Sequence, residues 1–153
     1  MMSAEEKLAE LGLVLPEPPQ PAGAYTRAVR WGDLLFVSGQ LPLAQGAIRY
    51  AGKVGADLSL EEGYAAAQLC ALNGLSILKA EAGGLDRVAR ILRLGGFVCS
   101  AEGFTDQAKV VNGASELFST VLGPKGVHAR LAVGVSQLPL GAAVELEIIA
   151  ALV

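Results

Sequence analysis

The distribution of apolar and polar residues near the C-terminal end of the chain predicts two β-strands. Apolar residues alternate with small or polar ones over residues 130–136 and again over residues 144–148, which is the two-residue period of a strand. Pro139 and Gly141 lie between the two runs and predict a short turn. Within the second run, alternation places the carboxylates of Glu145 and Glu147 on one face and apolar side chains on the other.

Arg130 shares its strand face with three small residues, Ala132, Gly134 and Ser136. We expect this floor of small side chains to leave room for a ligand beside the guanidinium. A guanidinium in such a space is a fork of donors that matches a carboxylate or a phosphate. The alternative is that Arg130 is an ordinary solvated residue, paired with a glutamate or with none, because surface arginines greatly outnumber ligand-binding ones.

Two long helices are predicted by apolar residues that recur at intervals of three and four. Ser59 and Glu62 form a capping-box pattern at the start of the first helix, and Gly83 follows its last periodic position. The second helix covers residues 105–122 and ends at the Gly-Pro pair that begins at Gly123. Cys70 falls inside the first helix, where we expect a packed and unreactive thiol.

The N-terminal part predicts a short helix, a proline-rich lead-in and two strands. Ser3 and Glu6 form another capping box, and the helix they begin is expected to stop near Gly12. Four prolines between residues 14 and 22 indicate an extended segment without regular structure. Residues 27–40 read as two strands that turn at a Gly-Asp pair. We expect an N-terminal extension over residues 1–22 and a folded domain over residues 23–153.

Residues 86–100 are compatible with two interpretations. Arg87, Arg90 and Arg93 at intervals of three would give a helix a basic face, whereas the apolar residues and the Gly95-Gly96 pair favour a strand with a bulge. The three arginines are the best candidate for a polyanion contact in the sequence, although a solvated or interfacial stripe is the commoner outcome for such residues.

The order of elements predicts an α+β fold with two helices on one face of a mixed sheet. The chain has 153 residues, enough for a single domain with its own core. Hydrophobic residues make up 52% of it and charged residues only 18%, which is apolar for a monomer. The sheet face without helices must therefore be covered, and we expect association between subunits to cover it.

Composition excludes several classes of function. The net charge of −3 offers no general attraction for nucleic acid. With Cys70, Cys99 and a single histidine, His128, no thiolate or histidine metal site can form in one chain. No apolar run is long enough for a membrane span, and the N-terminal residues do not resemble a signal peptide, so we expect a cytoplasmic protein.

Five stretches of the chain together resemble the YjgF/YER057c/UK114 family, also called the Rid family. The resemblance runs from about Gly23 to Ala150. The stretches are residues 23–25 (Gly-Ala-Tyr), 38–42 (Ser-Gly-Gln-Leu-Pro), 110–118 (around Asn112), 129–139 (Ala-Arg to Leu-Pro) and 144–147 (Val-Glu-Leu-Glu). The resemblance implies a domain like the bacillus-type chorismate mutase, whose sheets pack around the threefold axis of a homotrimer.

The resemblance also implies an activity, the hydrolysis of reactive enamines and imines of 2-oxo acids to the 2-oxo acid and ammonia. It assigns Arg130 to the substrate carboxylate, with a further contact from the backbone of Gly39, and Glu147 to holding and polarising the attacking water. It places the remaining substrate-binding residues in a cleft between subunits: Tyr25, Ser38, Asn112 and Ala132. No cofactor and no metal are expected, because a protonated imine is already electrophilic.

Three positions depart from the pattern of many family members, in which Pro-Ala-Arg-Ser-Cys stands around the arginine. Here the chain has His128 before the Ala-Arg pair and Leu131 and Ala132 after it. Ala132 replaces a thiol and widens the floor, whereas Leu131 falls on the opposite strand face. His128 could be a base that faces the substrate, but a position at the rim or at an interface is the commoner one. The departures affect the expected substrate range more than the fold.

Two alternative functions remain open. The first is a non-catalytic binder or sensor of 2-oxo acids that uses the same arginine without turnover. The second is an endoribonuclease, an activity attached to relatives under the name L-PSP. The acidic net charge, the 5% aromatic content and the single histidine argue against RNA cleavage.

Overall fold

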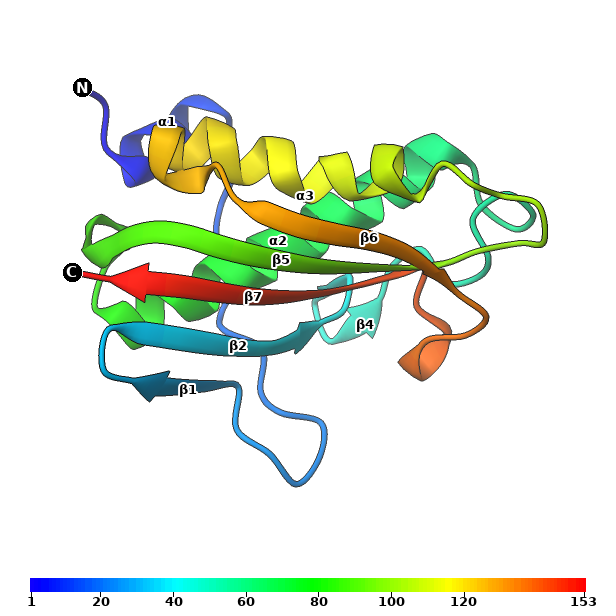
Figure 1. Cartoon of the computed structure of the whole chain (residues 1–153), viewed down its shortest axis with the longest axis horizontal. Coiled ribbons are helices and arrows are strands. Elements are labelled where there is room, and N and C mark those ends of the chain that lie inside the picture. Colours follow the sequence, from blue (N-terminus) through cyan, green and yellow to red (C-terminus); the bar gives the residue numbers. More distant parts are fainter.

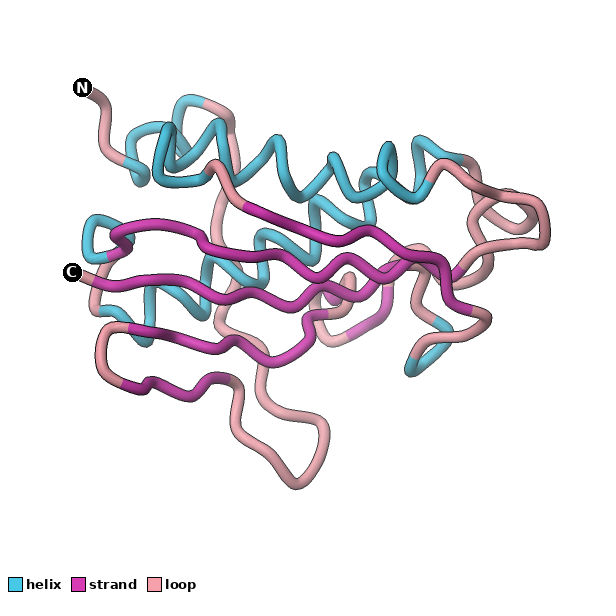
Figure 2. The backbone as a smooth tube through the Cα atoms, in the orientation of Figure 1, coloured by secondary structure: helices cyan, strands magenta, loops and turns pink.

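A five-stranded mixed sheet in the order β1-β2-β7-β5-β6 carries the fold (Figures 1 and 2). The computed structural model describes all 153 residues. The strands of this sheet are β1 (Ala28–Trp31), β2 (Leu34–Gln40), β5 (Val88–Cys99), β6 (Ala129–Val135) and β7 (Val144–Leu152). The β5–β6 pair is parallel and the other pairs are antiparallel. A separate two-stranded ribbon consists of β3 (Leu43–Ala44) and β4 (Ala47–Ile48). The predicted α+β class with a mixed sheet is confirmed.

Two helices cover one face of the sheet, and α2 passes behind it in Figure 1. Helix α2 (Leu60–Ala82) has the predicted capping box between Ser59 and Glu62, and it ends at Gly83, which has a left-handed φ of 86°. Helix α3 (Gln107–Leu122) begins two residues later than the sequence predicts. The apolar stripes of both helices enter one core with the alternate residues of β7. Neither helix, nor any other, is long and apolar enough to cross a membrane.

The N-terminal segment folds back against the helix layer. Helix α1 (Ala4–Glu10) begins at the predicted capping box of Ser3 and Glu6, and Leu8 enters the main core with only 4% of its surface exposed. The proline-rich segment that follows has no regular structure, as expected. The division of the chain into an extension and a domain stays a prediction.

The two C-terminal strands are not neighbours, although a short connection joins them. Strand β5 lies between β6 and β7, and α3 provides the crossover from β5 to its parallel partner β6. The connection to β7 contains a 3-10 turn, Pro139–Gly141; two others are Leu85–Arg87 and Gly123–Gly126. Because alternate residues of β7 are fully buried, this strand takes a central position with partners on both sides.

The ambiguous segment from residue 86 onwards is a strand. Strand β5 has irregular register between Val88 and Arg90 and between Ile91 and Arg93, whereas the register is continuous at Gly95-Gly96. The bulged strand is therefore confirmed, but the irregularities lie before the glycine pair. Arg93 pairs with Glu147, and Arg90 donates to the carbonyl oxygen of Val127. The three arginines therefore do not form one free basic stripe.

The part of the open sheet face that β1 and β2 form is apolar and uncovered. Alternation and register place Val29 and Trp31 of β1 on this face with Leu34 and Phe36 of β2 and Val133 of β6. Trp31 has 80% of its surface exposed and Phe36 has 42%. A contiguous apolar surface of this kind is typical of a face that another protein surface covers.

The helix layer depends on the close approach of α2 and α3 at Gly113. A Cβ atom on this residue would stand 2.1 Å from the backbone carbonyl oxygen of Tyr64, so any side chain forces the two helices apart. Asn112 and Ser115 lie on the same helix, and their positions follow from this contact.

Gly113→Ala should lower the free energy of unfolding by about 2 kcal/mol, because the overpacking outweighs the better helix propensity of alanine. The measurement is urea denaturation followed by circular dichroism. Gly63→Ala is the matched control in α2, since its Cβ would meet only side-chain methyl groups at 3.1–3.2 Å. Equal stability of the two variants would contradict this account of the helix contact.

Candidate functional site

The predicted site residues fall into two groups at different places on the sheet. Arg130 and Ala132 lie on the edge strand β6 next to Asn112 on α3, whereas Tyr25, Ser38 and Gly39 lie at or near β2. Strands β7 and β5 separate β2 from β6, which corresponds to about 14 Å at the usual strand spacing. A single chain therefore does not bring the two groups together.

The guanidinium of Arg130 is held by neutral groups of α3. Its Nη1 donates to Ser115 Oγ at 2.9 Å, and its Nη2 donates to the carbonyl oxygen of Ala108 at 3.1 Å. No carboxylate lies within ion-pair distance of Arg130, in contrast with Arg27 and Arg93. Its positive charge is therefore not compensated by the protein, and three of its five N–H donors remain for a ligand.

Asn112 lies on the same side of α3 as the two groups that hold Arg130. It follows Ala108 by four residues and precedes Ser115 by three, which are the helical spacings of neighbours on one face. Its half-buried side chain makes no hydrogen bond within the chain. The role of Asn112 and Arg130 in one site stays a prediction.

The predicted open floor beside Arg130 is filled by protein. A Cβ atom on Gly134 would stand 2.7 Å from Gln107 Nε2 and 3.0 Å from Ser100 Oγ. Ala132 packs against the main core. The small residues of β6 therefore let α3 approach the sheet, and the expectation that they leave room for a ligand is wrong within one chain. The free donors of Arg130 lie at the rim of the sheet.

The second half of the site surrounds the bulge of β2. Ser38, Gly39 and Tyr25 line one small pocket of about 60 Å³, together with residues of the proline-rich segment and Leu140. Ser38 Oγ donates to the carbonyl oxygen of Thr26 at 2.7 Å, and the Tyr25 hydroxyl accepts the N–H of Ala22 at 3.2 Å. Both hydroxyls are therefore engaged within the chain.

Glu145 lies directly against Gly39. A Cβ atom on Gly39 would stand 2.1 Å from a carboxylate oxygen of Glu145, so only glycine fits there. The Glu145 side chain is half-buried and has no ion-pair or hydrogen-bond partner. Burial, followed by repulsion from Glu147, raises the pKa of Glu145 above its ordinary value.

Glu147, the glutamate that the sequence analysis selected, is already paired. Its Oε1 accepts from Arg93 Nη1 at 2.7 Å on the open face of the sheet. A carboxylate engaged in this way has less capacity to polarise a water than an unpaired one. Sequence reasoning did not select Glu145 because both glutamates share one strand face, and only tertiary contacts, the Arg93 pair of Glu147 and the Gly39 contact of Glu145, distinguish them.

Arg130 and the two glutamates lie on opposite faces of the sheet. The register aligns Arg130 with Leu94 and Ile148, whose side chains are buried under the helices. It aligns Glu147 with Gly95 on the other face. Arg130 and the glutamates of β7 therefore do not face one another within one chain.

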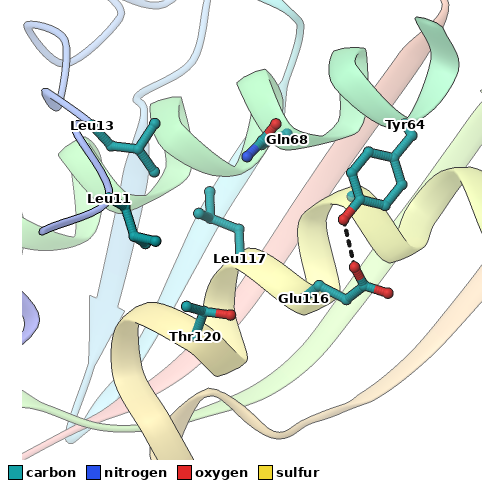
Figure 3. A pocket seen from close by; sticks show the side chains of 8 residues that line it. Leu11, Leu13, Tyr64, Gln68, Glu116, Leu117 and Thr120 are labelled. Atoms are coloured by element: carbon teal, nitrogen blue, oxygen red, sulfur yellow. Dashed lines mark hydrogen bonds between the residues drawn. The ribbon is translucent and has the colours of Figure 1, made fainter. Parts of the chain in front are cut away.

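Another pocket lies on the outer surface of the helix layer (Figure 3). It measures about 220 Å³ and is bounded by Leu11 and Leu13, and by the Tyr64 hydroxyl that donates to Glu116. None of its lining residues is basic, so it offers nothing to a carboxylate. No group of three or more histidine, cysteine or carboxylate side chains is arranged to hold a metal ion.

The chain belongs to the YjgF/chorismate mutase-like family, because the family model described as "YjgF/chorismate mutase-like, putative endoribonuclease" matches residues 5–152. It is 48% identical to Protein TCP17 of Trypanosoma cruzi over 141 residues, which cover 92% of this chain and 88% of that protein. It is 31% identical to the RutC family protein y4sK of Sinorhizobium fredii, over 89% of this chain and 93% of that one. A solved structure from Shewanella oneidensis MR-1 shares 34% of the sequence with a TM-score of 0.96, over 99% of this chain and 100% of that chain.

The two glutamates of β7 should respond in opposite directions to neutral substitution. Glu147→Gln breaks the half-exposed pair with Arg93 and should lower the free energy of unfolding by about 0.5 kcal/mol. Glu145→Gln should raise it at pH 8. The folded-state pKa of Glu145 lies above the unfolded one, so ionisation favours the unfolded chain, and stability is lost as the pH rises through the window above about 4.5.

Thermal unfolding of both variants at pH 4 and pH 8 checks this prediction, because the advantage of Glu145→Gln should shrink at the lower pH. If Glu145→Gln were the less stable variant and Glu147→Gln the more stable one, the contacts assigned to the two glutamates would be wrong.

Proposed function

We propose that this protein hydrolyses reactive 2-imino and 2-enamino acids to 2-oxo acids and ammonia. The observation that carries the proposal is the guanidinium of Arg130, which is fixed by neutral groups and has no counter-charge in the chain. A small carboxylate would supply that charge through a bidentate contact and would be oriented by it. Asn112 stands beside Arg130 as a further polar contact to the substrate.

The chemistry needs only a positioned water and a route for its protons. In the protonated imine, water adds to the C=N carbon, and the π electrons move to nitrogen. A proton then passes from the added oxygen to the amine, the C–N bond breaks, and the products are the 2-oxo acid and an ammonium ion. A carboxylate of β7 would hold the water and carry that proton. The sequence analysis assigned this role to Glu147; the contacts of the two side chains favour Glu145, whose raised pKa suits proton transfer.

We further propose that the complete site lies between subunits of a homotrimer. The half with Arg130 belongs to the β6 edge, and the half with Tyr25, Ser38, Gly39 and Glu145 belongs to the region of β2. Contact between two unlike surfaces repeats around a ring, and the apolar open face of the sheet provides the area for it. A cytoplasmic location is part of this proposal, since such imines arise where amino acids are degraded.

An imine-hydrolysis assay tests the function. With 2-iminobutanoate generated in the assay by an amino-acid oxidase, the wild-type protein should accelerate ammonia release. Arg130→Ala should lower kcat/KM by about two orders of magnitude. The kcat/KM of Arg130→Lys should lie between those of Arg130→Ala and the wild type, because lysine keeps the charge but loses the bidentate contact. Glu145→Gln should lower kcat more than Glu147→Gln. Arg87→Ala, which removes an exposed charge elsewhere, is the matched control.

Two results would contradict the proposal. If Arg130→Ala hydrolysed the imine at the wild-type rate, Arg130 would not be the residue that binds the substrate carboxylate. Binding of 2-oxobutanoate to the wild-type protein without any acceleration of imine hydrolysis would favour the non-catalytic binder instead. RNA cleavage that is lost in a point variant would favour an endoribonuclease, which the net charge of −3 and the paired arginines of β5 do not support.

The assembly is tested by a charge placed on the open sheet face. The wild-type protein should sediment as three chains at micromolar concentration, and Phe36→Glu should sediment as a monomer because a buried carboxylate without a partner is costly. Val14→Glu, at an exposed position outside the sheet, is the control that should remain assembled. A monomeric wild-type protein would contradict the intersubunit site.

A further inference from the structure

A chain of hydrogen bonds connects Arg130 to the backbone through Ser115 and His128, and the proposed chemistry gives His128 no role. His128 Nδ1 lies 2.6 Å from the carbonyl oxygen of Gly126, and His128 Nε2 lies 2.9 Å from Ser115 Oγ. Arg130 Nη1 donates to the same hydroxyl oxygen at 2.9 Å. The three side chains come from α3, from the start of β6 and from the loop between them.

The direction of each hydrogen bond follows from the chemistry of the groups. A carbonyl oxygen only accepts, so His128 Nδ1 carries the ring proton and Nε2 of the neutral ring is a bare acceptor. Ser115 has one hydroxyl proton, which it donates to Nε2, and its lone pair is then available to Arg130. The guanidinium can only donate. All three hydrogen bonds therefore run in one direction: Arg130 donates to Ser115, Ser115 donates to His128, and His128 donates to Gly126.

The surroundings of the imidazole favour this neutral form and its orientation. Phe118 packs edge-on against the ring, with the two ring centroids 6.3 Å apart. Burial lowers the pKa of His128 below its ordinary value, and the charge of Arg130 lowers it further. The hydrogen bond to Gly126 acts in the opposite direction but does not reverse the shift. A neutral His128 accepts from Ser115 without competing with Arg130 for an anion.

We propose that Ser115 and His128 are positioning residues that hold the Arg130 guanidinium ready for a carboxylate. This proposal rests on the proposed function, in which Arg130 binds the substrate carboxylate. Contacts to Nη1 and Nη2 from two different points of α3 fix the plane of the guanidinium before a ligand arrives. The entropy cost of ordering a long side chain is then met during folding and not during binding. Neutral partners do this without consuming the charge.

Binding of 2-oxobutanoate measured by calorimetry tests the proposal, with the uncharged 2-oxobutanamide as the comparison probe. Ser115→Ala and His128→Leu should each weaken 2-oxobutanoate binding by about fivefold and leave the amide within about twofold. His128→Gln should restore most of the affinity, because its amide oxygen can accept from Ser115 where Nε2 did. Ser119→Ala, the same change one turn further along α3, is the control that should bind as the wild type does.

The outcomes distinguish this proposal from the proposed function. If Arg130→Ala loses 2-oxobutanoate while Ser115→Ala and His128→Leu bind it as well as the wild type, the positioning role is wrong and the carboxylate contact stands. If Arg130→Ala binds as the wild type does, the carboxylate contact itself fails. An equal loss for 2-oxobutanoate and the amide would indicate a general disturbance of the fold and would also overturn the positioning role.

A measurement on the unaltered protein keeps the proposal testable if a variant does not fold. The nitrogen chemical shifts of the His128 ring should identify the tautomer with the proton on Nδ1. A proton on Nε2 would reverse the hydrogen bond with Ser115 and overturn the arrangement.

Discussion

The site depends on one packing constraint, the contact of α3 with the edge strand β6. The small side chains of β6 and Gly96 of β5 let this helix approach closely. Its backbone at Ala108 and its hydroxyl at Ser115 then reach the guanidinium of Arg130. An arginine anchored by dipoles keeps its full charge for a ligand, whereas one anchored by a carboxylate does not. Whatever displaces α3 therefore also displaces the binding group.

The same constraint underlies the proposal that the site lies between subunits. Since α3 covers the helix side of the sheet next to Arg130, the remaining guanidinium donors are at its rim. The acidic group with the altered pKa, Glu145, lies on the opposite face beside Gly39. Arg130 and Glu145 both lack a partner of opposite charge in the chain. In the proposed homotrimer, a neighbouring copy would bring the two groups together.

The two glutamates of β7 illustrate how packing assigns roles that chemistry alone leaves equal. They are the same residue type, two positions apart, with their side chains on the same face. Arg93 reaches one of them, and a glycine of β2 adjoins the other. Burial, followed by repulsion from Glu147, raises the pKa of Glu145, and the glycine that adjoins it comes from a strand far away in the sequence. His128 is a similar case, since its role follows from Gly126 and Ser115 together.

Local patterns in the sequence determined the elements, because caps, helical periods and strand alternation depend on neighbouring residues. They predicted the capping boxes of α1 and α2, the end of α2 at Gly83 and the alternation that separates Arg130 from Leu131. The tertiary structure decided what local patterns do not contain. Strand β5 separates β6 from β7, α3 packs against the small residues beside Arg130, and Arg93 forms an ion pair with Glu147. Each of these follows from contacts between distant segments, and such contacts depend on how whole elements pack together.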